Sequence, residues 1–257
     1  MAPQFAAALF QDALTTRAVG RVLVYRAVTA TTMTLARREA TAGAPHGTLV
    51  LAEEQTAGRG RRGRSFFSPP GENLYFTIVL RGSSESLRGL PLAVPLAVCR
   101  GIASEGVEAR IKWPNDIWVA GRKTCGMLID AEVAGPSAIA FPGIGINVNG
   151  DPTANPELRD TATSLARELG RPVTRELLLA RICDELEGAM ALPAKALAEA
   201  YREVSMILGR AVTVMGGGAT FAALATGIED DGGLRVRLDE GSERVLNAAE
   251  VSLRPRA

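Results

Sequence analysis

Residues 55 to 64 read Gln-Thr-Ala-Gly-Arg-Gly-Arg-Arg-Gly-Arg, with four arginines and three glycines in the last seven positions, in a chain whose net charge is only +1. Glycine lets backbone N–H groups approach a ligand closely, and guanidinium groups bind phosphate or carboxylate oxygens through paired hydrogen bonds. The stretch therefore predicts a site for a small anion, such as a nucleotide or an acyl phosphate. A solvated loop or an RNA-binding segment would use the same residues, but this stretch occurs once and has apolar segments on both sides.

Working outward from this loop, strand and helix patterns alternate along most of the chain. Strands are expected at residues 22–28, 49–53, 74–80, 109–112, 117–119, 124–133 and 138–148. Helices are expected at residues 31–41, 87–104, 163–169, 175–190 and 194–208. The helix at 87–104 must start late or kink, because it contains Pro91 and Pro95. The pattern predicts an α+β protein with a sheet core flanked by helices.

From Arg210 the sequence changes to short strand patterns separated by glycine-rich turns. These strands are expected at residues 211–215, 220–228, 234–238 and 244–246. A run of this kind predicts a small β-barrel attached to the main body. We therefore expect two domains, a catalytic domain at residues 1–207 and a small β-domain at residues 208–257.

The composition excludes several classes of protein. The 29 Lys and Arg residues nearly balance 28 Asp and Glu, which argues against a protein that coats DNA. No apolar run reaches the ~20 residues that cross a bilayer, so we expect a cytoplasmic protein. Cys99, Cys125 and Cys183 lack the spacing of a disulfide framework or a metal site and are expected to be buried. With His46 as the only histidine, expected in a loop, the chemistry must use lysine, arginine and carboxylate groups.

Three further segments carry polar residues next to strands. Lys112-Trp113-Pro114-Asn115-Asp116 places an ammonium, an amide and a carboxylate at one strand end, although an ordinary turn with an exposed lysine would look the same. Arg122 and Lys123 precede a strand in which Gly126 permits close approach to the backbone. Residues 143–149 read Gly-Ile-Gly-Ile-Asn-Val-Asn, which is not a dinucleotide-binding fingerprint, and the chain has no P-loop.

In this order and spacing, the segments resemble the biotin protein ligases, which attach biotin to a lysine of a carrier domain. The matching blocks are residues 55–64, 68–75, 112–116, 122–126 and 143–147. The resemblance implies a class II synthetase-like mixed sheet of the biotin/lipoate ligase type, with a small C-terminal SH3-like β-barrel. Only the residues before Val22 precede the first expected strand, too few for the DNA-binding domain of some relatives. We therefore expect a monofunctional enzyme with no DNA partner.

The resemblance also implies a reaction in two steps. Biotin and ATP form biotinyl-5′-AMP, and the amine of a lysine on a biotin carboxyl carrier domain of a carboxylase then displaces AMP. Fixed cations and backbone donors should stabilise the charge that develops on the α-phosphate, with Mg²⁺ screening the phosphates. No membrane partner is expected, and an exposed sheet edge would allow a homodimer without requiring one.

By matching positions, the resemblance assigns catalysis to Lys123, Arg61 and Lys112. The residues expected to bind biotin are Thr31, Thr32, Gln55, Gly58, Arg59, Gly60, Arg61 and Lys123. The residues expected to bind ATP are Arg59, Arg61, Arg64, Phe66, Lys112, Asn115, Asn147 and Arg254. Asp116 is expected to help bind magnesium.

Two positions depart from the pattern of the family. Met33 stands where many relatives carry asparagine, which removes a polar contact at the biotin pocket, and Phe66 stands where tryptophan is common, which keeps a ring able to stack on adenine. A lipoate or octanoate ligase or transferase is the main alternative, because a lysine-centred acyl site would serve either acid. A non-enzymatic RNA-binding protein is a second alternative, against which the 5% aromatic content and the single basic patch argue.

Overall fold

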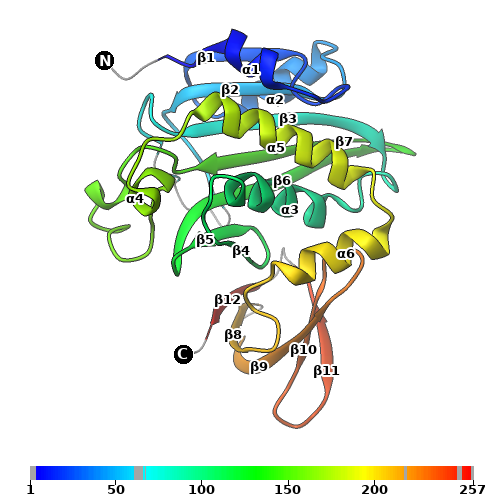
Figure 1. The fold of residues 1–257 in the computed structure, drawn as a ribbon. Helices are drawn as coiled ribbons and strands as arrows, with labels where there is room; N and C mark the ends of the chain where they lie inside the picture. The colour runs from blue at the N-terminus through cyan, green and yellow to red at the C-terminus, as the bar shows by residue number, and fades with distance from the viewer. Residues whose placement is uncertain (1–3, 61–65, 67, 217–218, 248–250, 256–257) are drawn as a thin grey trace.

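A seven-stranded mixed sheet forms the centre of the computed structural model, which describes residues 4–60, 66, 68–216, 219–247 and 251–255 (Figure 1). The strand order is β1-β2-β3-β7-β6-β5-β4. The bounds are β1 Leu23–Thr29, β2 Thr48–Gln55, β3 Leu74–Ser83, β4 Ala109–Lys112, β5 Asp116–Val119, β6 Arg122–Ala134 and β7 Ser137–Ile146. β1 and β2 pair in parallel, and the other neighbours pair antiparallel.

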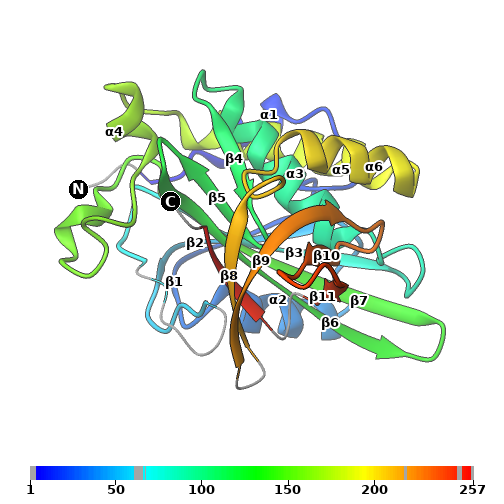
Figure 2. The same cartoon turned by 90° about the horizontal axis from the view of Figure 1, so that it is seen from below.

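Helices cover both faces of this sheet, as Figures 1 and 2 show. α2 (Thr32–Thr41) packs on one face, and α1 (Ala7–Ala13), α3 (Leu90–Ala103) and α5 (Arg175–Met190) pack on the other. The alternation of side chains along β2 explains this arrangement. Leu49 and Leu51 join the core beneath α3 and α5, whereas Val50 joins the smaller core beneath α2. β2 and β3 are thus buried on both faces over most of their length, and these strands are correspondingly apolar.

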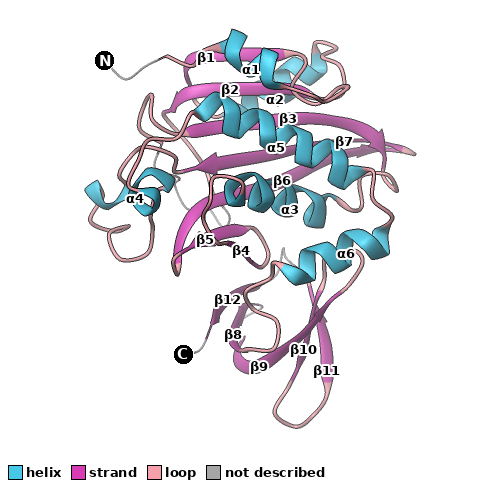
Figure 3. Cartoon of the chain, in the orientation of Figure 1, coloured by secondary structure: helices cyan, strands magenta, loops and turns pink. Residues whose placement is uncertain are grey.

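A second sheet follows α4 (Leu165–Leu169), α5 and α6 (Ala194–Glu203), as the colouring by secondary structure in Figure 3 shows. Its strands are β8 Ala211–Gly216, β9 Ala219–Ile228, β10 Leu234–Arg237, β11 Glu243–Leu246 and β12 Val251–Pro255. All its pairs are antiparallel, in the order β11-β10-β9-β8-β12. Within the described part of the chain β11 and β12 are its two edges, so closure into a barrel stays a prediction.

The small sheet contacts the main body directly. The indole Nε1 of Trp113 donates to the carbonyl oxygen of Gly232 over 2.9 Å. The guanidinium Nε of Arg202, at the end of α6, donates to the carbonyl oxygen of Ile228 over 3.0 Å. Val212 of β8 is fully buried and belongs to the same apolar cluster as the main body. The expected boundary between residues 207 and 208 therefore separates two sheets that are in contact with each other. The division into two independent domains stays a prediction.

The predicted strands of both sheets and the helix at 175–190 are confirmed within a few residues. The helix predicted at 194–208 is wrong beyond Glu203, because residues 204–206 bond to β4: Ile111 donates to the oxygen of Val204, and Met206 donates to the oxygen of Ile111. α1 and β12 were not predicted. The three cysteines are free and buried, as expected. No helix among the described segments is long and apolar enough to span a membrane.

Candidate active site

Glycines of two central strands form a bare patch on the face of the sheet that carries α2. Gly126 of β6 and Gly145 of β7 are paired across the ladder, and Gly143 lies two residues from Gly145 on the same side. A Cβ added at Gly145 would lie 2.5 Å from the ring of Phe66, and one at Gly143 would lie 2.7 Å from Met33 of α2. We call these three glycines the glycine floor. Side chains from the loop and from α2 therefore rest directly on backbone.

The predicted biotin residues Thr31, Thr32 and Gln55 lie together at the start of α2. Thr31 caps the helix, because its hydroxyl accepts the N–H of Thr34 over 3.0 Å. The oxygen Oε1 of Gln55 accepts both the N–H of Thr32 over 2.9 Å and its hydroxyl over 3.2 Å. Thr77 of β3 in turn donates to the hydroxyl of Thr32 over 2.9 Å. These polar groups form a fixed cluster beside the glycine floor.

The residues on either side of the arginine loop, which we define as residues 58–64, are hydrogen-bonded to each other and to this cluster. The N–H of Phe66 donates to the oxygen of Gly58 over 2.9 Å, and the amide of Gln55 donates to the hydroxyl of Ser68 over 3.2 Å. A Cβ at Gly58 would lie 2.8 Å from the oxygen of Phe66, so this close approach requires glycine. Arg59 is exposed at the start of the loop and Gly60 is partly buried. The predicted site residues Arg61 and Arg64 lie outside the described residues.

Two lysines lie on the hairpins β4–β5 and β5–β6 next to the floor. The ammonium of Lys123 lies 2.8 Å from the carboxylate of Asp116, and a Cβ at Gly126 would lie 2.9 Å from the same ammonium. Lys112, opposite Asp116 in the β4–β5 ladder, places its ammonium 4.3 Å from the ring centre of Trp118. The predicted turn at 112–116 thus brings a cation and a carboxylate to one end of the sheet. The third lysine of the chain, Lys195, is exposed at the start of α6.

The two asparagines expected to face the nucleotide both bond to the protein. The amide nitrogen of Asn115 donates to the oxygen of Met127. The amide nitrogen of Asn147, just past the end of β7, donates to the oxygen of Thr163 over 3.1 Å. Asn115 therefore links the β4–β5 turn to β6, and Asn147 links the end of β7 to the segment that contains Thr163. The contact of either asparagine with ATP stays a prediction. Arg254 lies on β12 opposite Thr213, and its role is likewise a prediction.

A magnesium ion would find few protein ligands here. Among the described residues no group of three or more His, Cys, Asp or Glu side chains is placed to hold a metal ion. Asp116 already pairs with Lys123, and it is the single predicted ligand. Because Mg²⁺ is commonly bound by one or two carboxylates together with substrate phosphates and water, these residues fit an ion that arrives with ATP.

Buried polar residues behind the site were not predicted as functional. Ser68, Asn73, Glu53 and Arg175 are each more than nine-tenths buried. The matching block at 68–75 contains Ser68 and Asn73, and its pattern predicts no role for either. Glu53, directly after the apolar run at residues 49–52 and on the same side of the strand as Leu49 and Leu51, is the available signal, because a buried carboxylate requires a partner.

Comparison with known proteins identifies the class of this architecture. Residues 25–147 match the Biotin/lipoate A/B protein ligase family, and residues 207–254 match the Biotin protein ligase C terminal domain. The sequence is 36% identical over 247 residues to the bifunctional ligase/repressor BirA of Bacillus subtilis, covering 91% of this chain and 75% of that protein. It is 37% identical over 219 residues to the biotin–[acetyl-CoA-carboxylase] ligase of Paracoccus denitrificans, covering 79% and 88%.

A solved structure agrees with these sequence matches. The biotin protein ligase from Aquifex aeolicus in complex with biotin and ATP superposes with a TM-score of 0.75 at 28% identity, covering 92% of this chain and all of that one. The chain belongs to the biotin protein ligase family. The α+β fold with a mixed sheet and a small C-terminal β-unit is thereby confirmed.

Proposed function

We propose that this chain is an ATP-dependent biotin–[biotin carboxyl-carrier protein] ligase that forms biotinyl-5′-AMP and transfers biotin to a carrier lysine. The observation that carries this function is the position of Lys123, whose ammonium lies against the glycine floor on the face that also holds Thr32 and Gln55. A carboxylate bound between these groups would meet both a cation and fixed donors. Relatives named as biotin ligases and a neighbour solved with biotin and ATP support the assignment.

The chemistry follows from bringing two anions together. The carboxylate of biotin attacks the α-phosphorus of ATP, the bond to the β-phosphate oxygen breaks, and pyrophosphate leaves. Lys123 and Lys112 are proposed to offset the charge on the carboxylate and the phosphate, and Arg59, Arg61 and Arg64 to bind the nucleotide. Magnesium entering with ATP would screen the phosphates, with Asp116 as a ligand after exchange from Lys123. The second step forms an amide bond at the carrier lysine and releases AMP.

The partners follow from the same proposal. The acceptor is a biotin carboxyl carrier domain of a carboxylase, and the location is the cytoplasm. A homodimer and the absence of DNA binding remain predictions from the sequence. Sedimentation of the protein with and without a DNA duplex would test both.

The direct test is isotope exchange between ATP and pyrophosphate in the presence of Mg²⁺. Exchange is expected with biotin and not with lipoate or octanoate. Exchange with either of those acids but not with biotin would favour the alternative ligase of the same superfamily. Salt-sensitive RNA binding with no exchange for any of the three acids would overturn the enzymatic assignment.

A further inference from the structure

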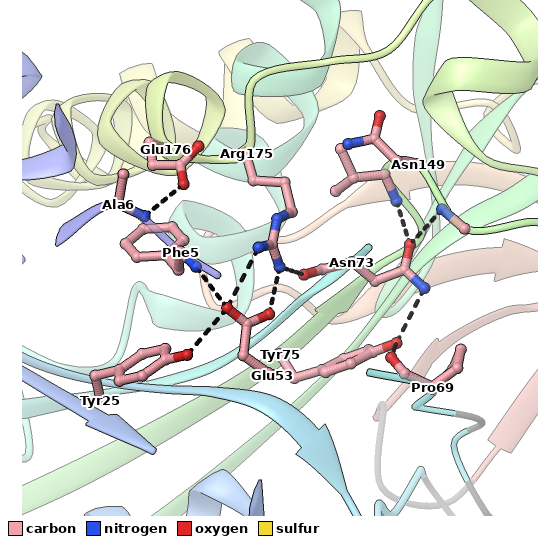
Figure 4. A network of polar contacts seen from close by, with 12 residues as sticks. Phe5, Ala6, Tyr25, Glu53, Pro69, Asn73, Tyr75, Asn149, Arg175 and Glu176 are labelled. Atoms are coloured by element: carbon pink, nitrogen blue, oxygen red, sulfur yellow. Dashed lines mark hydrogen bonds and ion pairs between the residues drawn. The ribbon is translucent and has the colours of Figure 1, made fainter. Parts of the chain in front are cut away.

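A buried ion pair lies behind the site, between the sheet and α5 (Figure 4). The guanidinium of Arg175 lies 2.7 Å from one oxygen of Glu53, and its second nitrogen donates to the other oxygen over 3.3 Å. Glu53 also accepts the N–H of Phe5 over 2.8 Å and the hydroxyl of Tyr25 over 3.2 Å. Because a buried charge is tolerated when it is paired and hydrogen-bonded, this arrangement is a rigid anchor.

Asn73 connects that anchor to both sides of the site. Its backbone oxygen accepts a hydrogen bond from Arg175 over 3.0 Å. Its side-chain oxygen accepts the N–H of Val148 over 2.8 Å and that of Gly150 over 3.2 Å, which holds the segment that contains Asn147. Its side-chain nitrogen donates to the hydroxyl of Tyr75 over 3.0 Å. Because Arg175 holds the backbone of Asn73, only one orientation of the Asn73 amide places its oxygen toward Val148 and Gly150 and its nitrogen toward Tyr75.

Tyr75 carries the connection to the arginine loop. Its hydroxyl donates to the oxygen of Pro69 over 3.1 Å, and its ring meets the ring of Phe66 edge-on, with the centres 6.3 Å apart. Burial raises the pKa of Tyr75 far above its ordinary value, so the phenol keeps the proton that it donates. Phe66 and residues 68–70 follow the arginine loop in sequence, and we call them its return limb. Tyr75 therefore contacts this limb at two points, one apolar and one polar.

We propose that Asn73 and Tyr75, held by the Glu53–Arg175 pair, are positioning residues that fix the return limb of the arginine loop over the glycine floor. This inference rests on the proposed function, because the bound species whose retention the limb controls is biotinyl-5′-AMP. The Phe66 ring of the limb rests on Gly145, and the adenylate would lie beside this ring on the same face of the sheet. A limb that is less well fixed would release it sooner, while the chemical groups on Lys123 and Lys112 stay in place.

Tyr75→Phe is the sharpest perturbation, because it keeps the ring contact with Phe66 and removes the hydroxyl that reaches Pro69. The matched control is Tyr201→Phe. Tyr201 is equally buried, and within the described part of the chain its hydroxyl has no hydrogen-bond partner. The wild type and each variant would first form adenylate from biotin, ATP and Mg²⁺. The rate at which the adenylate dissociates would then be measured after rapid dilution and divided by the number of titrated active sites.

We expect Tyr75→Phe to release adenylate about two- to tenfold faster than wild type, the factor that corresponds to one neutral hydrogen bond. Tyr201→Phe should match wild type. A purely structural role would lower the melting temperature and the number of active sites without changing the release rate per site. If Tyr75→Phe does not fold, Asn73→Asp provides the second test, because it keeps the acceptor for Val148 and loses the donor to Tyr75.

Equal release rates in Tyr75→Phe and wild type would overturn the positioning role and leave the ligase assignment intact. For Asn73→Asp, an unchanged release rate per site would overturn it equally. Wild-type protein that forms no adenylate at all would overturn the proposed function and this inference together. The outcomes of the two proposals are thus distinguishable in one series of measurements.

Discussion

Replacing Lys123 with alanine separates the catalytic role of this residue from its structural one. Its ion pair with Asp116 is partly exposed, at 36% for the lysine and 22% for the aspartate side chain. Pairs of this kind contribute at most about 1 kcal/mol to stability. For a chain of this size that corresponds to a fall of about 2–4 °C in melting temperature. The folded structure should therefore survive the substitution.

The effect on activity should be much larger. Lys123 is the ammonium beside the glycine floor, and loss of one preorganised group that stabilises transition-state charge costs about 10²–10³-fold in rate. We expect biotin-dependent ATP–pyrophosphate exchange to fall by at least that factor in Lys123→Ala. Lys195→Ala removes the same group from an exposed position on α6 and should leave exchange unchanged. Exchange by Lys123→Ala within twofold of wild type, at saturating biotin and ATP, would refute the assignment of Lys123.

Three further outcomes follow from the geometry. Gly145→Ala would place a Cβ 2.5 Å from the ring of Phe66, the ring expected to stack on adenine. Displacing this ring at an overpacking cost of about 1–3 kcal/mol should raise the KM for ATP at least about fivefold in exchange assays, and an unchanged KM would contradict this contact. Arg175→Met leaves the buried Glu53 carboxylate without its cation and should lower the free energy of unfolding by about 3–5 kcal/mol in urea titrations, whereas a loss below 1 kcal/mol would argue against burial of the pair. Burial raises the pKa of Cys99 to about 12, above its ordinary value of 9.0, so the thiolate is scarce at pH 8.5. Iodoacetamide should then label Cys99 in unfolded but not in folded protein, as mass spectrometry would show.

Local patterns were sufficient to predict most strands, because alternating or continuous apolar residues and glycine turns lie within each segment. α1 had no such local signal. Its N-cap residue Ala6 provides no side-chain cap, and the N–H of Ala6 instead donates to Glu176 over 2.7 Å, 170 positions away. β12 forms by pairing with β8, and this contact is also distant in sequence. Elements stabilised by distant partners cannot be read from their own residues.

In the candidate site, too, residues in local motifs were predictable from the sequence and pairs of distant residues were not. The blocks around Gln55, Lys123 and Gly145 were predicted, since each is a compact motif, and the structure brings them to one face of the sheet. The pairing of Glu53 with Arg175 spans 122 positions, and no local spacing predicts it.

The scarcity of lysine in this chain has a chemical consequence. An acyl adenylate reacts with any accessible amine, and an enzyme that makes one is itself exposed to acylation. Of three lysines, Lys112 and Lys123 stand beside the glycine floor and its hairpins, and their ammonium groups are engaged with Trp118 and Asp116. Lys195 is the remaining side-chain amine, while the other 26 cationic side chains are arginines that do not form stable amides under these conditions. Because its positive side chains are almost entirely guanidinium groups, the enzyme offers the reactive product few amine targets.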